Sequence, residues 1–281
     1  MKTLYISDLD GTLLGPDAAL SPETTAIINR LSDQGLLFTV ATARSIASVR
    51  NILKDIRLSV PVVLMNGVCI YDFNVNDYLK IEYLPPKSVE QLMQIIKSYR
   101  LKGFAYSIKD GKLSTYYEDI DSEALREFYN ERVKLYRKRF TQIEDFSSLT
   151  GEPLIYFTLL DRREQLEHIY RAIEAAGEFN CVFYKDNYSP DLWYLEIYSR
   201  TASKFHAVQA LRDLLEPDRI VCFGDNRNDF PLFEAGDLKI AVGNAVEELK
   251  AKADLIIGKN TQDGVAVWLK ENAELPGVKI M

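Results

Sequence analysis

The sequence predicts an α/β protein, with a Rossmann-like doubly wound parallel sheet and an inserted α+β domain. Three observations predict this fold. Apolar strand runs alternate with amphipathic helices over residues 1–83, helices joined to hairpins follow over 84–195, and the first pattern returns over 196–281. We therefore expect a core built from 1–83 and 196–281, and a second domain formed by 84–195.

The first part of the chain reads as strand, helix, strand, helix and strand. Leu4 to Ile6 predicts a short buried strand. Ser21-Pro22-Glu23 is a strong helix start, because it joins an N-cap, a proline at the first helical position and an acid. Two more buried strand runs, 36–41 and 61–65, flank a helix over about 46–53. Strands that alternate with helices in this way indicate a parallel sheet.

The inserted part combines helices with hairpins. Lys109-Asp110-Gly111-Lys112 is a clear hairpin turn between two apolar runs. One helix is expected from Asp121 through about Arg139, and its basic residues are interpreted as a solvated face. Those residues are Arg132, Lys134, Arg137, Lys138 and Arg139. The other expected elements are helices over 88–99 and 164–176, strands over 104–108, 113–117 and 154–160, and a final hairpin formed by 181–184 and 193–198.

The last part returns to alternation. A helix over 203–215 precedes a strand over 219–223, which ends in Gly224-Asp225. A short helix around Phe230 to Phe233 and a strand over 238–242 follow. This order resumes the doubly wound sheet of the first part.

Composition narrows the class of protein. The chain has 281 residues, of which 47% are hydrophobic, so it can bury a sizeable core. Its net charge of -7 argues against nucleic acid or an anionic membrane as partner, and no apolar run approaches the length of a membrane span. Three cysteines in apolar contexts read as reduced core residues, which favours a cytoplasmic location. A monomer or weak homo-oligomer is expected.

Two aspartates follow the first strand run, one residue apart. In Asp8-Leu9-Asp10-Gly11-Thr12, an extended backbone would place both carboxylates on one side, at the carboxyl end of a strand. Such a pair suits phosphoryl transfer, because one acid can attack phosphorus while the other moves protons. The alternative is an Asp-Gly turn whose acids cap backbone groups.

Four strand runs end in polar residues that suit a phosphate. They are Asp8, Thr42, Asn66 and Asp225. In a parallel sheet the carboxyl ends share one edge, so we expect these side chains to converge on one crevice. Thr42 offers a hydroxyl to a phosphate oxygen, although a satisfied Thr at the end of a strand is the alternative.

A cation and further acids complete the expected site. Lys204 lies at the start of a helix, where exposed N–H groups already favour an anion, although a solvated side chain is the alternative for a lysine in a first turn. Asp225 and Asp229 would join Asp8 and Asp10 near a phosphate. Two like charges 4 Å apart repel by about 4 kcal/mol at an effective dielectric constant near 20, so a divalent cation is needed. Oxygen ligands without His or Cys favour Mg²⁺.

With these residues assembled, the chain resembles the haloacid dehalogenase superfamily. The resemblance is carried by Asp8-Leu9-Asp10-Gly11-Thr12, Thr42, Lys204 and the loop from Gly224-Asp225 to Asn228-Asp229. Asn66-Gly67, the long insertion, residues 241–245 and residues 263–266 are similar to the Cof-like sugar-phosphate phosphatases with a type IIB cap. The chain departs from that pattern at two places. Ala43 stands where many members have Gly, and residues 199–203 lack the Gly that members often have before the lysine.

The resemblance implies a role for each core residue. Asp8 would be the nucleophile and a metal ligand, and Asp10 the general acid/base, with its backbone carbonyl on the metal. Asp225 would be the third protein ligand, and Asp229 would support the metal directly or through water. The phosphate would be held by Thr42, Lys204 and Asn228, helped by the backbone N–H groups of Leu9 and Ala43.

The expected function is a Mg²⁺-dependent phosphatase that acts on small phosphorylated metabolites, with sugar phosphates as the expected class, through an aspartyl phosphate. The cap would close over the core and select the leaving group. Residues expected on the substrate side are Arg44, Asn66, Asp186, Asn187, Tyr188, Trp193 and Tyr194. A phosphomutase on the same fold and a non-catalytic sugar-phosphate sensor are the alternatives.

Overall fold

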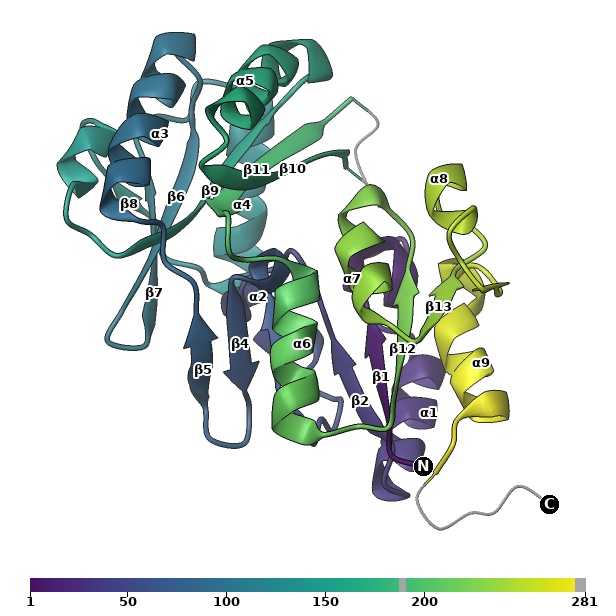
Figure 1. The fold of residues 1–281 in the computed structure, drawn as a ribbon. Coiled ribbons are helices and arrows are strands. Elements are labelled where there is room, and N and C mark those ends of the chain that lie inside the picture. Colours follow the sequence, from purple (N-terminus) through teal and green to yellow (C-terminus); the bar gives the residue numbers. More distant parts are fainter. Residues whose placement is uncertain (187–190, 276–281) are drawn as a thin grey trace. The chain divides into compact units, whose positions relative to one another are not determined.

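The structure is a computed structural model that describes residues 1–186 and 191–275. It divides the chain into two compact units, residues 1–79 with 203–281 and residues 80–202 (Figure 1). The predicted boundaries at 84 and 195 both fall inside the second unit. We call the first unit the core unit and the second the cap unit; the functions that these names imply stay predictions.

The core unit is organised around a parallel sheet, which confirms the predicted fold class. In the described part of the chain its five strands follow the order β14-β13-β12-β1-β2, and every pair is parallel. The strands are β1 (Thr3–Ser7), β2 (Leu37–Val40), β12 (Arg219–Gly224), β13 (Leu238–Ala241) and β14 (Leu255–Ile256). β1, which lies between β12 and β2, is fully buried, as its apolar run predicts.

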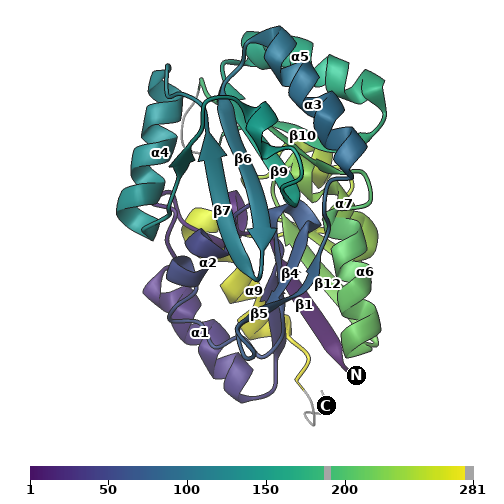
Figure 2. The same cartoon turned by 90° about the vertical axis from the view of Figure 1, so that its left-hand side faces the viewer.

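Helices cover both faces of this sheet. One face carries α1 (Pro22–Asp33) and α9 (Gly264–Asn272), which pack against each other. The other carries α6 (Lys204–Leu215) and α7 (Phe230–Ala235), as both views show (Figures 1 and 2). Ser21 caps α1 as predicted, and its hydroxyl accepts a hydrogen bond from the backbone N–H of Thr24 at 2.9 Å. The shorter helices are α2 (Ile46–Ile52) and α8 (Glu247–Lys250).

The third predicted strand is the exception to the parallel sheet. β3 (Val62–Leu64) pairs antiparallel with β4 (Cys69–Asp72), and these two form a small sheet with β5 (Asp77–Ile81). An isolated parallel bridge, Ala41 to Val63, connects β3 to the end of β2, and the Thr42 N–H donates to the Val63 carbonyl at 3.0 Å. The expectation that Asn66 ends a ladder strand of the main sheet is therefore wrong. It lies in the turn Met65–Gly67 that joins β3 to β4.

The cap unit is a mainly antiparallel layer with helices on both sides, in which only the short pairing of β7 with β8 is parallel among the described strands. Its sheet follows the order β10-β11-β9-β6-β7-β8, and Figure 2 shows α4 on one side of β6 and β7 with α3 and α5 on the other. The helices are α3 (Pro86–Tyr99), α4 (Glu123–Tyr136) and α5 (Arg163–Ala176). The strands are β6 (Gly103–Lys109), β7 (Lys112–Tyr117), β8 (Thr141–Gln142), β9 (Leu154–Asp161), β10 (Phe179–Lys185) and β11 (Trp193–Ser199).

The helix that carries the basic cluster ends earlier than predicted. α4 stops at Tyr136, and Arg137 adopts a left-handed conformation at φ 50°. The predicted end near Arg139 is wrong, because the chain reverses at Arg137 so that the Lys138 N–H donates to the Arg132 carbonyl at 3.1 Å. Lys138 is 8% exposed and therefore does not belong to a solvated face.

Two further expectations concern the cysteines and membrane-spanning helices. All three cysteines are free, Cys69 and Cys222 being buried and Cys181 half-buried. Within the described ranges, the structure contains no helix whose length and apolar character would let it cross a bilayer.

The backbone at Gly67, in the turn between β3 and β4, leaves no room for a side chain. Gly67 has a φ of +94°, and a Cβ there would lie 2.1 Å from the carbonyl oxygen of Ser203. Gly151 has nearly the same φ, +91°, but nothing lies within 4 Å of its Cβ position. We expect Gly151→Ala to lower the free energy of unfolding by about 1 kcal/mol, from backbone strain alone. Gly67→Ala should lower it by about 1 to 3 kcal/mol more, because the backbone before α6 must move.

Urea denaturation followed by circular dichroism measures both free energies. Equal losses in the two variants would show that the contact between Gly67 and Ser203 imposes no constraint.

Candidate active site

The register of two strands brings distant acids together. β1 and β12 are neighbours, Ser7 lies opposite Phe223, and the Asp8 N–H donates to the Phe223 carbonyl at 3.0 Å. Asp8 and Asp225 thus follow the ends of adjacent parallel strands. Carboxylate oxygens of Asp8, Asp225 and Asp229 lie within 4.8 Å of one another, and all three residues are buried. The predicted convergence of residues 8 and 225 is present in the structure.

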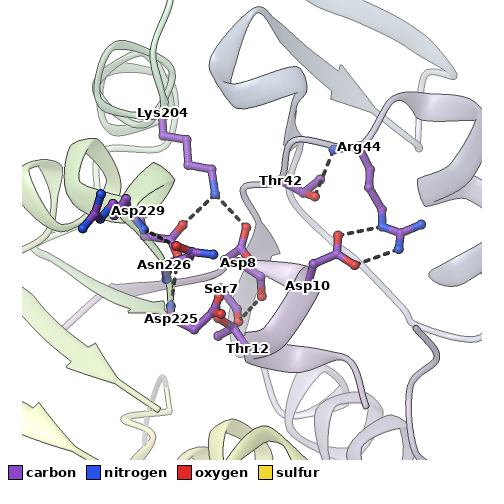
Figure 3. A network of polar contacts seen from close by, with 11 residues as sticks. Ser7, Asp8, Asp10, Thr12, Thr42, Arg44, Lys204, Asp225, Asn226 and Asp229 are labelled. Carbon is purple, nitrogen blue, oxygen red and sulfur yellow. Dashed lines mark hydrogen bonds and ion pairs between the residues drawn. The ribbon is translucent and has the colours of Figure 1, made fainter. Parts of the chain in front are cut away.

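One ammonium group lies between two of these carboxylates. Lys204 Nζ is 2.6 Å from Asp8 Oδ1 and 2.7 Å from Asp229 Oδ1 (Figure 3). Only 1% of the lysine is exposed. Its place is fixed by the start of α6, where the Ser203 hydroxyl caps the helix by accepting from the His206 N–H at 3.1 Å. Lys204 therefore supplies the buried positive charge that the acids require.

The loop after β12 holds Asp229 from two sides. While Asp229 Oδ1 faces Lys204, Oδ2 accepts the backbone N–H groups of Asp225 at 2.9 Å and Asn226 at 3.1 Å. Gly224 makes this possible, because a Cβ there would lie 2.8 Å from the Asp229 Cβ. Both oxygens of Asp229 are engaged, so this residue is better placed to anchor Lys204 and the loop than to bind an ion directly.

Asp10 faces a different partner from Asp8. Its carboxylate forms a bidentate ion pair with Arg44, in which Nε and Nη2 donate at 2.7 Å each. Figure 3 shows this pair pointing away from Lys204. The side chain of Asp10 is 25% exposed and that of Asp8 is 4% exposed. The two acids of the first motif thus occupy different environments, and Arg44, which we expected on the substrate side, contacts Asp10.

The remaining predicted residues lie around this centre with different degrees of exposure. Thr42 is buried, and its hydroxyl accepts from the Arg44 N–H at 3.1 Å. Asn66 is buried beside it, and its N–H donates to the Thr42 carbonyl at 3.0 Å. Leu9 is buried, while Ala43 and Asn228 are half-buried.

The predicted cap residues do not form one group. Trp193 packs on the side of the sheet that holds the hydrophobic core, with its ring 4.8 Å from that of Phe183. Tyr194, the next residue of β11, points to the opposite face and contacts Phe128. The two therefore cannot contact one ligand together. Asp186 is half-buried beside β10, and Asn187 and Tyr188 lie outside the described residues.

Sequence reasoning missed Thr12 and the role of Arg44. The Thr12 hydroxyl donates to Asp225 Oδ1 at 2.9 Å and so joins the two acidic segments. Thr12 follows Asp10-Gly11 directly in the sequence, so its closeness to the acidic site could have been predicted. The bidentate pair between Arg44 and Asp10 had no such signal, because it depends on how the turn after β1 directs the Asp10 side chain.

The electrostatics reflect an excess of buried negative charge. Burial, followed by the charge of Asp229, raises the pKa of Asp8 to about 8. Burial raises the pKa of Asp225 well above its ordinary value, with Asp229 and Asp8 adding to the shift. Burial alone would lower the pKa of Lys204, but the charges of Asp229 and Asp8 outweigh it and raise that pKa. One ammonium does not balance three carboxylates, so the site favours additional positive charge.

Comparison with known proteins decides the family. A family model described as haloacid dehalogenase-like hydrolase matches residues 5–269. The chain belongs to the haloacid dehalogenase-like hydrolases. The predicted membership and the predicted enzyme class, a hydrolase of this superfamily, are confirmed.

Several known proteins are similar to this chain over nearly its whole length. Pyridoxal phosphate phosphatase YbhA of Escherichia coli is 25% identical, over 96% of this chain and 98% of its own. The 5-amino-6-(5-phospho-D-ribitylamino)uracil phosphatase YitU of Bacillus subtilis is 26% identical, over 95% and 96%. Among solved structures, TM0651 of Thermotoga maritima matches with a TM-score of 0.78 at 24% identity, covering 98% of both chains.

A further solved structure shares the fold of both units. BT4131, described as a sugar phosphatase of haloacid dehalogenase subclass IIB, has a TM-score of 0.75 at 16% identity. The match covers 96% of this chain and 98% of that protein.

The buried charges predict a pH-dependent role for Lys204. We expect Lys204→Met to lower the free energy of unfolding by about 3 to 5 kcal/mol near pH 8, because it leaves buried carboxylates without their cation. The loss should shrink towards pH 5, since the raised pKa values of Asp8 and Asp225 let these carboxyls bind protons and become neutral.

Thermal and urea unfolding at pH 5 and pH 8 test this, with exposed Lys270→Met as the matched control. A loss that is the same at both pH values would contradict the account.

Proposed function

We propose that this hydrolase is a Mg²⁺-dependent phosphatase, which cleaves small phosphorylated metabolites of the sugar-phosphate class through an aspartyl phosphate on Asp8. The observation that carries the proposal is the position of Asp8. It follows the buried strand β1, at the edge of the sheet where its carboxylate meets Asp225, Asp229 and Lys204. The family and the names of the similar proteins support phosphate-ester hydrolysis as the reaction.

The residues present fit a magnesium ion. Three buried carboxylates offer oxygens within 4.8 Å of one another, and neither His nor Cys is among them. Hard oxygen donors of this kind are the ligands that Mg²⁺ takes in proteins. Asp8 and Asp225 would hold the ion with the Asp10 carbonyl, and Asp229 would support it from its anchored position. When bound, the ion supplies positive charge that neutralises the phosphate and orients it.

The residues of the chain divide the chemistry between them. Asp8 attacks phosphorus, so that a bond forms between its carboxylate oxygen and phosphorus while the bond to the leaving oxygen breaks. Asp10 gives the leaving oxygen a proton and later takes one from the water that hydrolyses the aspartyl phosphate. Lys204 and Thr42 bind the phosphoryl oxygens through an ammonium and a hydroxyl. The hydrolysis releases inorganic phosphate and restores the Asp8 carboxylate.

The environments of the two acids suit their different tasks. Asp8 is buried beside the Lys204 ammonium, which fixes the position of a carboxylate oxygen. Burial also keeps that oxygen from being surrounded by water. Asp10 is partly exposed and paired with Arg44, so it can exchange protons with water and the leaving group. Two carboxylates with separate environments and separate roles are a recurrent arrangement in acid–base catalysis.

The nucleophile is tested by Asp8→Asn. We expect this variant to lower kcat for phosphate release by more than about 1,000-fold, because the amide cannot form the aspartyl phosphate. Asp213→Asn, an exposed aspartate of α6, is the matched control and should retain full activity. Phosphate release from a panel of phosphorylated sugars gives the rates, and circular dichroism shows whether the fold persists. Retained turnover in Asp8→Asn would refute the assignment.

Binding of Mg²⁺ should depend on pH in a defined direction. Because the pKa of Asp8 is raised to about 8, protons compete with the ion below that pH. We expect the affinity for Mg²⁺ to rise from pH 6 to pH 8, by at most about tenfold per pH unit for each proton released. Isothermal titration calorimetry measures this, with Asp225→Asn expected to bind weakly at every pH. An affinity independent of pH would contradict the prediction.

A further inference from the structure

The loop that follows β13 contacts both acidic segments of the candidate site. At one end of the contact, the side-chain amide of Asn244 donates to the Gly11 carbonyl at 2.7 Å, in the turn that carries Asp10. Two residues later, the Val246 N–H donates to the Asp225 carbonyl at 2.8 Å. One short loop of the core unit therefore connects two acidic segments that are distant in the sequence.

The contact with Asn244 falls on the most adaptable residue of the turn. Gly11 is buried and has a φ of 81°, and Asp10 before it is not helical either, with a φ of -74° and a ψ of 116°. Because glycine adopts several backbone conformations at similar free energy, hydrogen bonds must hold the chain here. Asn244 holds the Gly11 carbonyl, and the Thr12 hydroxyl donates to Asp225 Oδ1 at 2.9 Å. The peptide unit that bears the Asp10 carbonyl directly precedes these two contacts.

A second asparagine fixes the orientation of Asn244. The Asn260 N–H donates to Asn244 Oδ1 at 2.9 Å, which aligns the amide so that its Nδ2 faces Gly11. The Asn260 side chain donates to the Leu14 carbonyl at 2.8 Å, just beyond the same turn. Two carbonyls around the Asp10 turn are thus held by side chains from the loops after β13 and β14. Such a linked pair of amides is more than a chance contact at the surface.

The exposure of Asn244 separates a positioning role from a purely structural one. Asn244 belongs to residues 241–245, to which the proposed reaction assigns no task, and it is exposed although Gly11 is buried. Replacing an exposed side chain leaves no cavity in the core. A contact that served only the fold would therefore change stability slightly and would not change the binding of an ion.

We propose that Asn244 is a positioning residue of the metal site, which holds the Gly11 carbonyl and thereby keeps the adjacent Asp10 carbonyl in a fixed place relative to Asp225. This inference rests on the proposed function, in which that carbonyl and Asp225 bind Mg²⁺. Replacing a side chain that orients the ligands of a metal typically lowers the affinity for the metal by about 10- to 100-fold.

Isothermal titration calorimetry with Mg²⁺ alone, on the full chain at pH 8 and without substrate, measures the effect. We expect Asn244→Ala to raise the Kd for Mg²⁺ by about tenfold or more relative to the wild-type protein. With Mg²⁺ in excess, the KM for glucose 6-phosphate should stay at the wild-type value, because Asn244 acts on the metal ligands and does not contact the substrate.

Asn272→Ala is the matched control. Asn272 is also exposed, and its amide also donates to a backbone carbonyl, that of Trp268 at 2.9 Å. This variant should bind Mg²⁺ as the wild-type protein does. Urea denaturation followed by circular dichroism should show that Asn244→Ala and Asn272→Ala both fold and lose similarly little stability.

Three results would overturn the positioning role. They are a wild-type Kd for Mg²⁺ in Asn244→Ala, an equal rise of the Kd in Asn272→Ala, and the absence of Mg²⁺ binding by the wild-type protein. If the Kd is unchanged but the KM for glucose 6-phosphate rises, Asn244 is a substrate contact instead.

These results are distinguishable from failure of the proposed function. If Mg²⁺ binding depends on Asn244 but the wild-type protein releases no phosphate from any probe of the panel, the function fails and the positioning role stands. If phosphate is released and Asp8→Asn abolishes the release while Asn244→Ala binds Mg²⁺ normally, the reverse holds.

Discussion

Mutual repulsion of buried carboxylates is the constraint on which the core unit depends. Asp8, Asp225 and Asp229 bring oxygens within 4.8 Å of one another in a place that water does not screen. Lys204 bridges two of them, and Thr12 donates a hydrogen bond to the third. The remaining negative charge accounts for the raised pKa values of Asp8 and Asp225. The same charge that is costly in the fold is what prepares the site for a divalent cation and a phosphate.

The surrounding fold can be understood as the means of holding these charges. The pairing of β1 with β12 aligns residues 8 and 225, and the capped start of α6 carries Lys204 into the interior. Asp229 uses one oxygen for Lys204 and the other for the loop backbone, so charge and loop geometry are fixed together. Arg44 forms an ion pair with Asp10 and so fixes the position of that carboxylate. Each acid of the first motif has its own cation.

The sequence permitted prediction of the parts that follow from topology. Parallel strands end at one edge, so the meeting of Asp8 with Asp225 could be inferred from two apolar runs and the acids after them. Lys204 could be inferred from its place at the start of a helix. The strand before Asn66 was misassigned, because three buried apolar residues suit a ladder of either direction. The Asn66-Gly67 pair, a signal for the tight turn that leads into β4, was not used as one.

The positions of two charged side chains could not be predicted, because hydrophobic periodicity does not show where a side chain points after a turn. The pairing of Arg44 with Asp10 depends on the turn after β1, and the burial of Lys138 depends on a left-handed residue, Arg137, where glycine is the usual signal. Periodicity assigned Lys138 to a solvated helix face, although this residue lies two positions past the end of α4 and its side chain lies over Tyr106. Both cases concern charged side chains whose partners are distant in sequence.

The central claim is that these carboxylates bind one divalent cation and leave Asp8 able to accept a phosphoryl group. A crystal structure of the protein soaked with Mn²⁺, a Mg²⁺ substitute with an anomalous signal, tests it most directly. The account predicts an anomalous peak in contact with the carboxylates of both Asp8 and Asp225. A peak elsewhere, or full occupancy of a site that does not include Asp8, would contradict it.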